Sequence, residues 1–310
     1  MHWKAKAIAQ NVIAVLPPPL GDAVYFQLQK HVGALRALDR IHYFEMACRI
    51  DSLARTRGRQ VEGSFVIEVG TGWDLTLALG LWLGGARKVL SVDLYRHVRP
   101  ELVWESLLFV RDHPERVQTA LGGLTRSREF ARRRDHLLAA LERPKPFPIP
   151  REIEYRAPAD AARLDLADGA ADLHVSRSVL EHVPTEVLPP LLAEGRRVVG
   201  PGGLLLHGVD FTDHFSHGDP NISTIHFLRY SPRSWKRLAG NRFMYQNRLR
   251  VDELEHLFRS AGFHVSVLEV DLNSRALREL ESGHPLDPRF RGKSAETLAT
   301  AGAWFLAEAV

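Results

Sequence analysis

Acidic residues and glycines stand together at the end of one apolar run of this chain. The run at 65–69 contains Glu68 and leads directly into a turn with Gly70 and Gly72. Glycine lets a backbone approach a bound ligand closely and adopt φ and ψ values that a Cβ would forbid. A helix expected from about Leu75 would present free N–H groups beside that turn. This arrangement is typical of a strand, turn and helix that bind a nucleotide-like cofactor.

A second and a third acid follow the next two strand-like runs. Asp93 ends the run at 88–92, and an acid at the tip of a second strand is placed to hydrogen-bond a ribose diol. Asp160 follows the run at 152–156, where its carboxylate could accept a hydrogen bond from the exocyclic amine of adenine. The acids at the strand ends together indicate a cofactor that contains adenosine.

A parallel sheet is needed to bring these residues together, because ligands of open α/β sheets bind outside the carboxyl ends of the strands. From residue 65 onward strand-like and helix-like runs alternate, which predicts a mostly parallel, seven-stranded sheet with helices on both faces. Strands are expected at 65–69, 88–92, 152–156, 172–176, 203–209, 264–270 and 303–309. Helices are expected at 75–83, 186–198 and 251–261.

Two long stretches interrupt this alternation. Residues 95–150 exceed an ordinary crossover and predict a helical insertion. Within it, helices are expected at 100–111 and 124–142, followed by a stiff, extended proline tract at 144–150. Residues 212–250 form the second stretch outside the sheet, which is expected to cap the substrate site.

The N-terminal segment, residues 1–60, is expected to be helical, and the domain that contains the sheet to fill 61–310. Residues 3–16 place apolar and polar side chains at helical spacing before three consecutive prolines, which predicts an amphipathic helix. This helix either packs on the domain or makes a weak peripheral membrane contact. One or two more helices are expected at 22–57.

Composition excludes several classes of protein. Hydrophobic residues make up 45% of the 310 positions and charged residues 25%, as in ordinary globular proteins, and no apolar run is long enough to span a bilayer. The net charge of +4 is too small to argue for a nucleic-acid partner. The single Cys48 excludes a disulfide framework and indicates a reducing, cytoplasmic location. The arginines within 126–134 form either a solvated helix face or an anion-attracting rim.

Several short motifs along the chain resemble, in the same order, those of class I S-adenosylmethionine-dependent methyltransferases, in particular the branch acting on small molecules (the methyltransferase domain 11 type). The motifs lie at 68–72, Asp93, 160–161, 168–172, 180–183 and 201–203. The resemblance covers roughly residues 60–210. It implies a Rossmann-like fold and S-adenosyl-L-methionine as the cofactor.

The resemblance also implies a role for each motif. Glu68 and the backbone of the glycine turn would hold the methionine part of the cofactor, and Asp93 would bind the ribose hydroxyls. Asp160 and the residue after it would bracket the adenine, while the end of the fourth strand would line the floor where methionine and methyl acceptor meet. The candidate cofactor-binding residues are Glu68, Gly70, Thr71, Gly72, Asp93, Leu94, Asp160, Ala161, Ser176 and Arg177.

The chain departs from the family pattern at Asp74, where a third glycine is frequent. A carboxylate at this place is expected to alter how tightly the turn holds the cofactor. The spacing from Glu68 to Asp93 is also slightly long, which the loop at 83–86 can absorb.

Histidines and acids after the fourth and fifth strands are the candidates for the reaction itself. The methyl carbon of a sulfonium is already electrophilic, so the protein must align the acceptor, exclude water and, for a hydroxyl acceptor, remove a proton. Histidine has a suitable pKa for that step, and the candidate catalytic residues are His182, Asp210 and His214. In the alternative, His182 only packs at a helix start, and His214 and His217 are polar loop residues.

Metal binding is a further alternative for the loop after the fifth strand. Asp210, Asp213, His214 and His217 have the chemistry of metal ligands. The segment has no second dedicated cluster of carboxylates, however, so no metal is expected.

Arginines and aromatic residues are interleaved between 229 and 250. They would recognise an anionic or glycosyl substrate, or else the aromatics form the small core of a helical subdomain. Residues 221–250 and the N-terminal helix with its prolines also resemble methyltransferases of bacterial surface-glycan and secondary-metabolite biosynthesis. That resemblance implies a small molecule or glycan precursor as the substrate, and the sequence leaves the oligomeric state open.

Two other classes of function are weighed against a methyltransferase. An NAD(P)-dependent oxidoreductase is disfavoured because Leu75 occupies the last position of the Gly-x-Gly-x-x-Gly/Ala pattern. A non-catalytic binding protein of the same fold is disfavoured because the acids Glu68, Asp93 and Asp160 are intact.

Overall fold

Seven strands form one mixed sheet in the computed structural model, which describes residues 2–142 and 149–309. Their order is β3-β2-β1-β4-β5-β7-β6, with β1 to β5 parallel and β7 antiparallel to both of its neighbours. The strands are β1 Phe65–Val69, β2 Lys88–Val92, β3 Ile153–Arg156, β4 Leu173–Arg177, β5 Leu204–Asp210, β6 Phe263–Leu272 and β7 Thr300–Ala309. Each expected strand is present within a few residues of its expected limits, so the mostly parallel, Rossmann-like sheet is confirmed.

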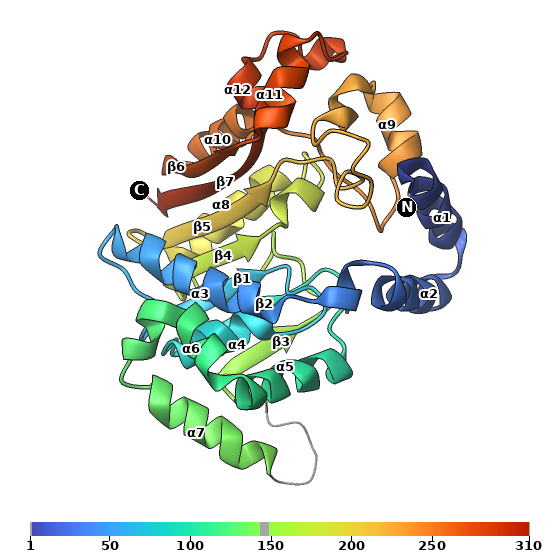
Figure 1. Cartoon of the computed structure of the whole chain (residues 1–310). Helices are drawn as coiled ribbons and strands as arrows, with labels where there is room; N and C mark the ends of the chain where they lie inside the picture. The colour runs from blue at the N-terminus through green and yellow to red at the C-terminus, as the bar shows by residue number, and fades with distance from the viewer. Residues whose placement is uncertain (1, 143–148, 310) are drawn as a thin grey trace.

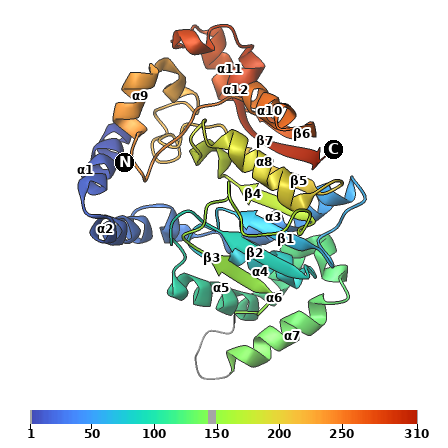
Figure 2. The same ribbon diagram turned by 180° about the vertical axis from the view of Figure 1, so that it is seen from behind.

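Helices cover both faces of this sheet (Figures 1 and 2). They are α1 Trp3–Val15, α2 Pro18–His31, α3 Arg40–Arg55, α4 Thr76–Leu83, α5 Pro100–Asp112, α6 Pro114–Leu121, α7 Phe130–Leu141, α8 Leu188–Val199, α9 Pro232–Ala239, α10 Val251–Ser260, α11 Ser274–Glu281 and α12 Ala295–Ala299. Side chains alternate along β1, so Val66 joins the core under α3 and α4, whereas Ile67 joins the core under α8 and α10. Burial on both faces explains why the parallel strands are continuous apolar runs in the sequence. Among the described residues, no helix is both long and apolar enough to cross a bilayer.

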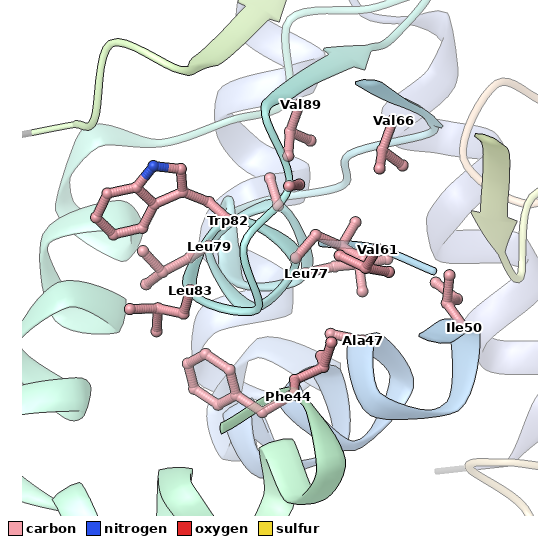
Figure 3. Packing of buried hydrophobic residues seen from close by; sticks show 14 of the residues in the cluster. Phe44, Ala47, Ile50, Val61, Val66, Leu77, Leu79, Trp82, Leu83 and Val89 are labelled. Atoms are coloured by element: carbon pink, nitrogen blue, oxygen red, sulfur yellow. The ribbon is translucent and has the colours of Figure 1, made fainter. Parts of the chain in front are cut away.

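The helix that follows the glycine turn, α4, is buried along its whole length. It lies between the sheet and α3, where Phe44 and Ala47 pack against it (Figure 3). A Cβ on Gly80 would lie 2.9 Å from the Cβ of Ala47, so this glycine lets α3 and α4 approach closely. An apolar residue at nearly every position suits a helix that is covered on all sides. The turn before α4 is therefore attached to a helix that is buried along its whole length.

Two helical regions differ from the sequence prediction. The helix expected at 124–142 begins only at Phe130, and a separate helix, α6, precedes it. α2 begins at Pro18, inside the proline run that ends α1, because proline suits a first helical turn, where the N–H groups have no partner within the helix. The proline tract expected at 144–150 falls largely on 143–148, which are outside the described residues. The division into segments 1–60 and 61–310 stays a prediction.

A third, smaller core joins the N-terminal helix to the stretch at 212–250. Trp3 and Ala7 of α1 pack there with Phe215 and with Trp235 of α9. α1 lies beside α9 in both views (Figures 1 and 2). The aromatic residues of the stretch therefore form a small core, which is the structural alternative weighed for them in the sequence.

Three arginines that look like surface charge in the sequence are buried against backbone carbonyl groups. Arg250 is fully buried and donates to the carbonyl oxygens of Phe211 at 2.7 Å and Leu298 at 2.9 Å. Arg248 donates to two carbonyl oxygens at 2.9 and 2.7 Å, and Arg133 donates to one at 2.8 Å. These guanidinium groups hold loops in place and are not free to recognise an anionic substrate.

Candidate functional site

The turn after β1 needs its two glycines for different reasons. Gly70 and Gly72 have φ values of +78° and +75°, in the left-handed region that favours glycine. A Cβ on Gly70 would lie 2.4 Å from a methyl carbon of Val179, so the loop after β4 packs directly on this residue. A Cβ on Gly72 would meet no described atom within 4 Å. Gly70 is therefore required by packing, while Gly72 borders open space at the carboxyl edge of the sheet.

Glu68 is connected to this turn through hydrogen bonds. Its carboxylate is buried and accepts a hydrogen bond of 2.5 Å from the Ser91 hydroxyl, which in turn lies 2.6 Å from the Thr71 hydroxyl. The pKa of Glu68 is raised to about 7, chiefly by burial; the hydrogen bond from Ser91 opposes this rise, and the nearby carboxyls of Asp74 and Asp93 add to it. The chain from Glu68 through Ser91 to Thr71 thus links β1, β2 and the turn.

Asp74, at the position where the family frequently has a glycine, lies two residues before α4. One oxygen of its buried carboxylate accepts from the Thr76 amide at 3.1 Å, and the other accepts from the hydroxyls of Thr76 at 2.8 Å and Ser106 at 3.1 Å. Burial raises the pKa of Asp74, and these hydrogen bonds oppose the rise. Asp74 therefore holds the first residue of α4 and ties it to Ser106 of α5.

Asp93 lies directly opposite the turn. One oxygen of its carboxylate accepts a 3.3 Å hydrogen bond from the Gly72 amide, and the other accepts from the Tyr95 amide at 3.3 Å. Burial raises the pKa of Asp93, and His97 is the largest opposing influence. Leu94 and Tyr95 are both 55% exposed, which leaves two apolar side chains beside the carboxylate. The structure therefore brings Gly72, Asp93 and Leu94 together at one edge of the sheet.

The loop after β3 joins the same edge. The Ala159 amide donates to the Asp93 carbonyl at 2.8 Å, which places Asp160 and Ala161 alongside the end of β2. The Asp160 side chain is exposed and accepts from the Ala162 amide at 2.9 Å. One carboxylate oxygen of Asp160 is thus used to shape the loop.

Ser176 is placed differently from the expectation that its side chain lines the cofactor floor. It is fully buried, and its hydroxyl lies 2.7 Å from Nδ1 of His207, whose Nε2 is 3.3 Å from Nδ1 of His174. Burial lowers the pKa of His174 to about 4. The pair of buried histidines gave no sequence signal of its own, because neither stands in a motif. Arg177 is half-buried and donates to the Ser178 hydroxyl.

Asp210, at the end of β5, faces two histidines of the loop that follows it. One carboxylate oxygen accepts from the Thr212 amide at 2.8 Å and from the Thr212 hydroxyl at 2.6 Å. The other lies 3.5 Å from Nε2 of His214 and 3.6 Å from Nε2 of His217. Nε2 of His217 is also 2.8 Å from the Thr212 hydroxyl. The structure thus brings together Asp210 and His214, two of the predicted catalytic candidates.

His182 approaches the same place from the loop after β4. Its ring centroid lies 4.8 Å from that of His214, and its Nδ1 is 2.7 Å from the Tyr245 carbonyl oxygen. The preceding residue, Glu181, accepts from the Asp210 amide at 3.3 Å. Burial raises the pKa of Glu181 to about 7. Glu181 is not among the sequence-predicted candidates, although its position beside His182 was a signal for it.

The histidine cluster and the glycine turn are neighbours. Val179, whose side chain packs on Gly70, precedes Glu181 by two positions in the same loop. A ligand that occupies the open space beside Gly72 and extends past this contact meets the end of β4. One edge of the sheet thus carries a cofactor-type turn with buried acids next to a group of proton-binding side chains.

A family model supports the resemblance found in the sequence. Residues 134–207 match the model described as a methyltransferase domain. The matched residues make up less than half of the chain. The match spans β3, β4 and the loops with Asp160 and Glu181, and the turn at Gly70 lies before it. S-adenosylmethionine is the cofactor that this match implies. No curated protein sequence matches the chain.

Solved structures of low sequence identity are similar to the chain. One is an S-adenosylmethionine-dependent methyltransferase from Mesorhizobium loti, at 13% identity and a TM-score of 0.43, covering 83% of this chain and 96% of that one. Another is from Methanosarcina mazei, at 16% identity and 0.42, covering 80% and 92%. A third is the [4+2]-cyclase SpnF, at 17% identity and 0.41, covering 84% and 80%. At this level of similarity they say nothing about the substrate.

Proposed function

We propose that this protein transfers a methyl group from S-adenosyl-L-methionine to a small molecule, such as a glycan or secondary-metabolite precursor. The observation that carries the proposal is the contact between Val179 and Gly70, which joins the glycine turn to the loop of Glu181 and His182. A methyl donor seated in the turn would have its reactive end beside groups that can accept a proton. The single Cys48 supports a cytoplasmic location, and the small net charge supports a partner other than nucleic acid.

The residues of the turn fit the cofactor. A Cβ on Gly72 would meet no described atom within 4 Å, so there is open space beside this residue. Two backbone amides hold the carboxylate of Asp93 in a position to accept hydrogen bonds from ribose hydroxyls. The exposed Leu94 offers an apolar surface to adenine, and the loop that carries Asp160 and Ala161 is joined to the end of β2 through the Ala159 amide. Three acids, Glu68, Asp74 and Asp93, surround a turn that would receive a ligand with a cationic sulfonium and an ammonium group.

In the proposed reaction the cofactor supplies a methyl carbon bound to positively charged sulfur. The acceptor atom forms a bond to that carbon as the carbon–sulfur bond breaks, and the sulfur leaves as a neutral thioether. His182, Asp210 and His214 would orient the acceptor and take its proton. Arg177 would line the approach to the methyl group. The exposed cations of α9, Arg233, Lys236 and Arg237, support an anionic or glycosyl acceptor.

The amphipathic helix α1 supports a second, weaker association. Its inner face is buried against the small core, while Ile8, Val12 and Val15 are 64%, 63% and 86% exposed. These three residues lie on one side of the helix, and Leu20 of α2 is exposed as well. An exposed apolar stripe of this kind supports a weak peripheral contact with a membrane surface.

Binding and turnover are tested in two steps. Calorimetry with S-adenosylhomocysteine and with NAD separates the cofactor classes, and we expect binding of the first alone. A screen of acceptors with a labelled methyl donor, followed by mass spectrometry, then locates the new methyl group. Binding of NAD without S-adenosylhomocysteine would favour an oxidoreductase. Binding of S-adenosylhomocysteine with no transfer to any small acceptor would favour a non-catalytic binding protein.

A further inference from the structure

Five titratable side chains from two loops converge at the carboxyl ends of β4 and β5. The ligand atoms of Glu181, His182 and His214 all lie within 4.8 Å of one another, and so do those of Asp210, His214 and His217. We propose that Glu181, His182 and His214 bind a divalent transition-metal ion. Glu181 and His182 follow β4, whereas His214 follows β5. The sequence did not predict this site, because the three residues meet only in the folded chain.

The carboxylate of Glu181 carries the first part of the argument. The residue is only 5% exposed, and one of its oxygens is satisfied by the Asp210 amide. The other oxygen, Oε2, has no hydrogen-bond partner in the part of the chain that the structure describes. A buried polar atom without a partner is costly, and polar groups in protein interiors are rarely left this way. A cation bound at Oε2 would satisfy it.

The two histidines present lone pairs to the same place. The Tyr245 carbonyl can only accept, so Nδ1 of His182 carries the hydrogen and Nε2 retains its lone pair. Metal-binding histidines characteristically donate their second nitrogen to a carbonyl or carboxylate in this way. Nε2 of His214 is buried and has no hydrogen-bond partner among the described residues. Each of the three side chains thus offers one atom that makes no hydrogen bond to a described residue, although Nε2 of His214 also lies 3.5 Å from the Asp210 carboxylate.

The overlapping group of Asp210, His214 and His217 is the weaker candidate for the ion. Nε2 of His217 already lies at hydrogen-bond distance, 2.8 Å, from the Thr212 hydroxyl, and the His217 side chain is 51% exposed. Asp210 contributes negative charge beside the ion, since its second carboxylate oxygen is 3.5 Å from Nε2 of His214. We therefore assign the ion to the first group. With the ion bound, His182 and His214 would no longer take the proton of the acceptor, and that role would fall to Asp210 alone.

The donor set indicates which ions fit. Two imidazole nitrogens and one carboxylate oxygen are the ligands of catalytic zinc sites and of iron(II) facial triads, whereas calcium and magnesium prefer oxygen ligands throughout. Three protein ligands leave a coordination position open. If the proposed methyl transfer is correct, an acceptor hydroxyl bound there would lose its proton more easily and would lie next to the methyl donor. This consequence rests on the proposed function, but metal binding itself does not.

The test is metal binding by the full-length chain after treatment with a chelator. We expect one equivalent of Zn²⁺ by calorimetry, and visible absorption from Co²⁺ with nitrogen ligands. Glu181→Gln and His214→Asn should weaken Zn²⁺ binding about tenfold or more, while the matched variant His217→Asn should bind within about threefold of wild type. Far-UV circular dichroism and thermal melting check that each variant folds.

Two results would overturn the assignment. The first is the absence of stoichiometric Zn²⁺ and Co²⁺ uptake by the wild-type chain. The second is loss of binding in His217→Asn with retention in Glu181→Gln, which would move the ion to the other group. S-adenosylhomocysteine calorimetry on the metal-free chain separates the two proposals. Cofactor binding without metal uptake rejects only the metal site, and metal uptake without cofactor binding rejects only the methyltransferase.

Discussion

The carboxyl group of Glu68 makes the stability of the protein depend on pH in a direction opposite to that of a salt-bridged acid. Burial, reinforced by the carboxyls of Asp74 and Asp93, raises the pKa of Glu68 from 4.5 to about 7. Below pH 4.5 the group is protonated in the folded and the unfolded chain and has no differential effect. Between pH 4.5 and 7 the folded chain binds the proton more tightly, so stability falls as the pH rises. Above pH 7 the loss is complete.

The size of this effect follows from the shift in the pKa. One pKa unit corresponds to about 1.4 kcal/mol, so a rise from 4.5 to about 7 costs the folded chain about 3 kcal/mol at pH 8. Glu68→Gln keeps the shape of the side chain and an oxygen that accepts from Ser91, but it cannot ionise. We therefore expect the variant to match wild type near pH 4.5 and to exceed it by about 3 kcal/mol at pH 8, or roughly 6 °C in Tm.

The assay is denaturant unfolding of both proteins across pH 4.5 to 8. At each pH the free energy of unfolding of wild type is subtracted from that of Glu68→Gln. Taking the difference removes the contributions of all other titrating groups that the two proteins share. Glu45→Gln, which alters an exposed carboxyl of α3, serves as the matched control and should follow wild type throughout. A difference between Glu68→Gln and wild type that does not change with pH, or one that favours wild type at pH 8, would refute the reasoning.

Three further predictions concern the turn, its ligand and the N-terminal helix. Asp93→Ala should lower S-adenosylhomocysteine affinity more than tenfold in calorimetry while leaving the thermal melt intact, and unchanged affinity would show that Asp93 does not touch the cofactor. Gly70→Ala places a Cβ 2.4 Å from a valine methyl and should lower the free energy of unfolding by about 1–3 kcal/mol, whereas Gly72→Ala should cost less stability and chiefly weaken ligand binding. Ile8→Ser combined with Val12→Ser should abolish sedimentation with anionic vesicles without lowering Tm, because both side chains are exposed; equal sedimentation of variant and wild type would contradict the membrane contact.

The sheet could be predicted from the sequence because its signal is local. Each buried strand is a short apolar run, and the residues at strand ends, such as Glu68 and Asp93, must share one edge of a parallel sheet. The local role of Asp74 could also have been predicted, since an aspartate side chain often accepts from the backbone amide two residues later. The departure from the glycine pattern therefore has a structural role at the start of α4.

The parts that could not be predicted depend on partners brought together only by folding. Arginine is usually a surface residue, and the sequence around Arg250 does not indicate that distant carbonyl groups will surround it. His174 and His207 likewise meet across two strands in the interior of the sheet. Glu181 joins Asp210 through a contact between two loops. The spacing of residues in the sequence predicts which face of a helix or strand is buried and which residues lie at the edge of the sheet. It carries little information on which buried polar groups will pair.

The N-terminal helix connects the outer surface of the protein to the histidine cluster. The Trp3 amide donates to the Asp219 carboxylate at 2.9 Å, and Nζ of Lys6 donates to the His214 carbonyl oxygen at 3.2 Å. The Trp3 ring also packs on Phe215, at 5.8 Å between centroids. α1 thus fastens the loop that carries His214, while its opposite face, with Ile8, is open to solvent. Because a helix buries one face and exposes the other, the same thirteen residues can hold a proposed metal ligand in place and still offer an apolar stripe to a membrane.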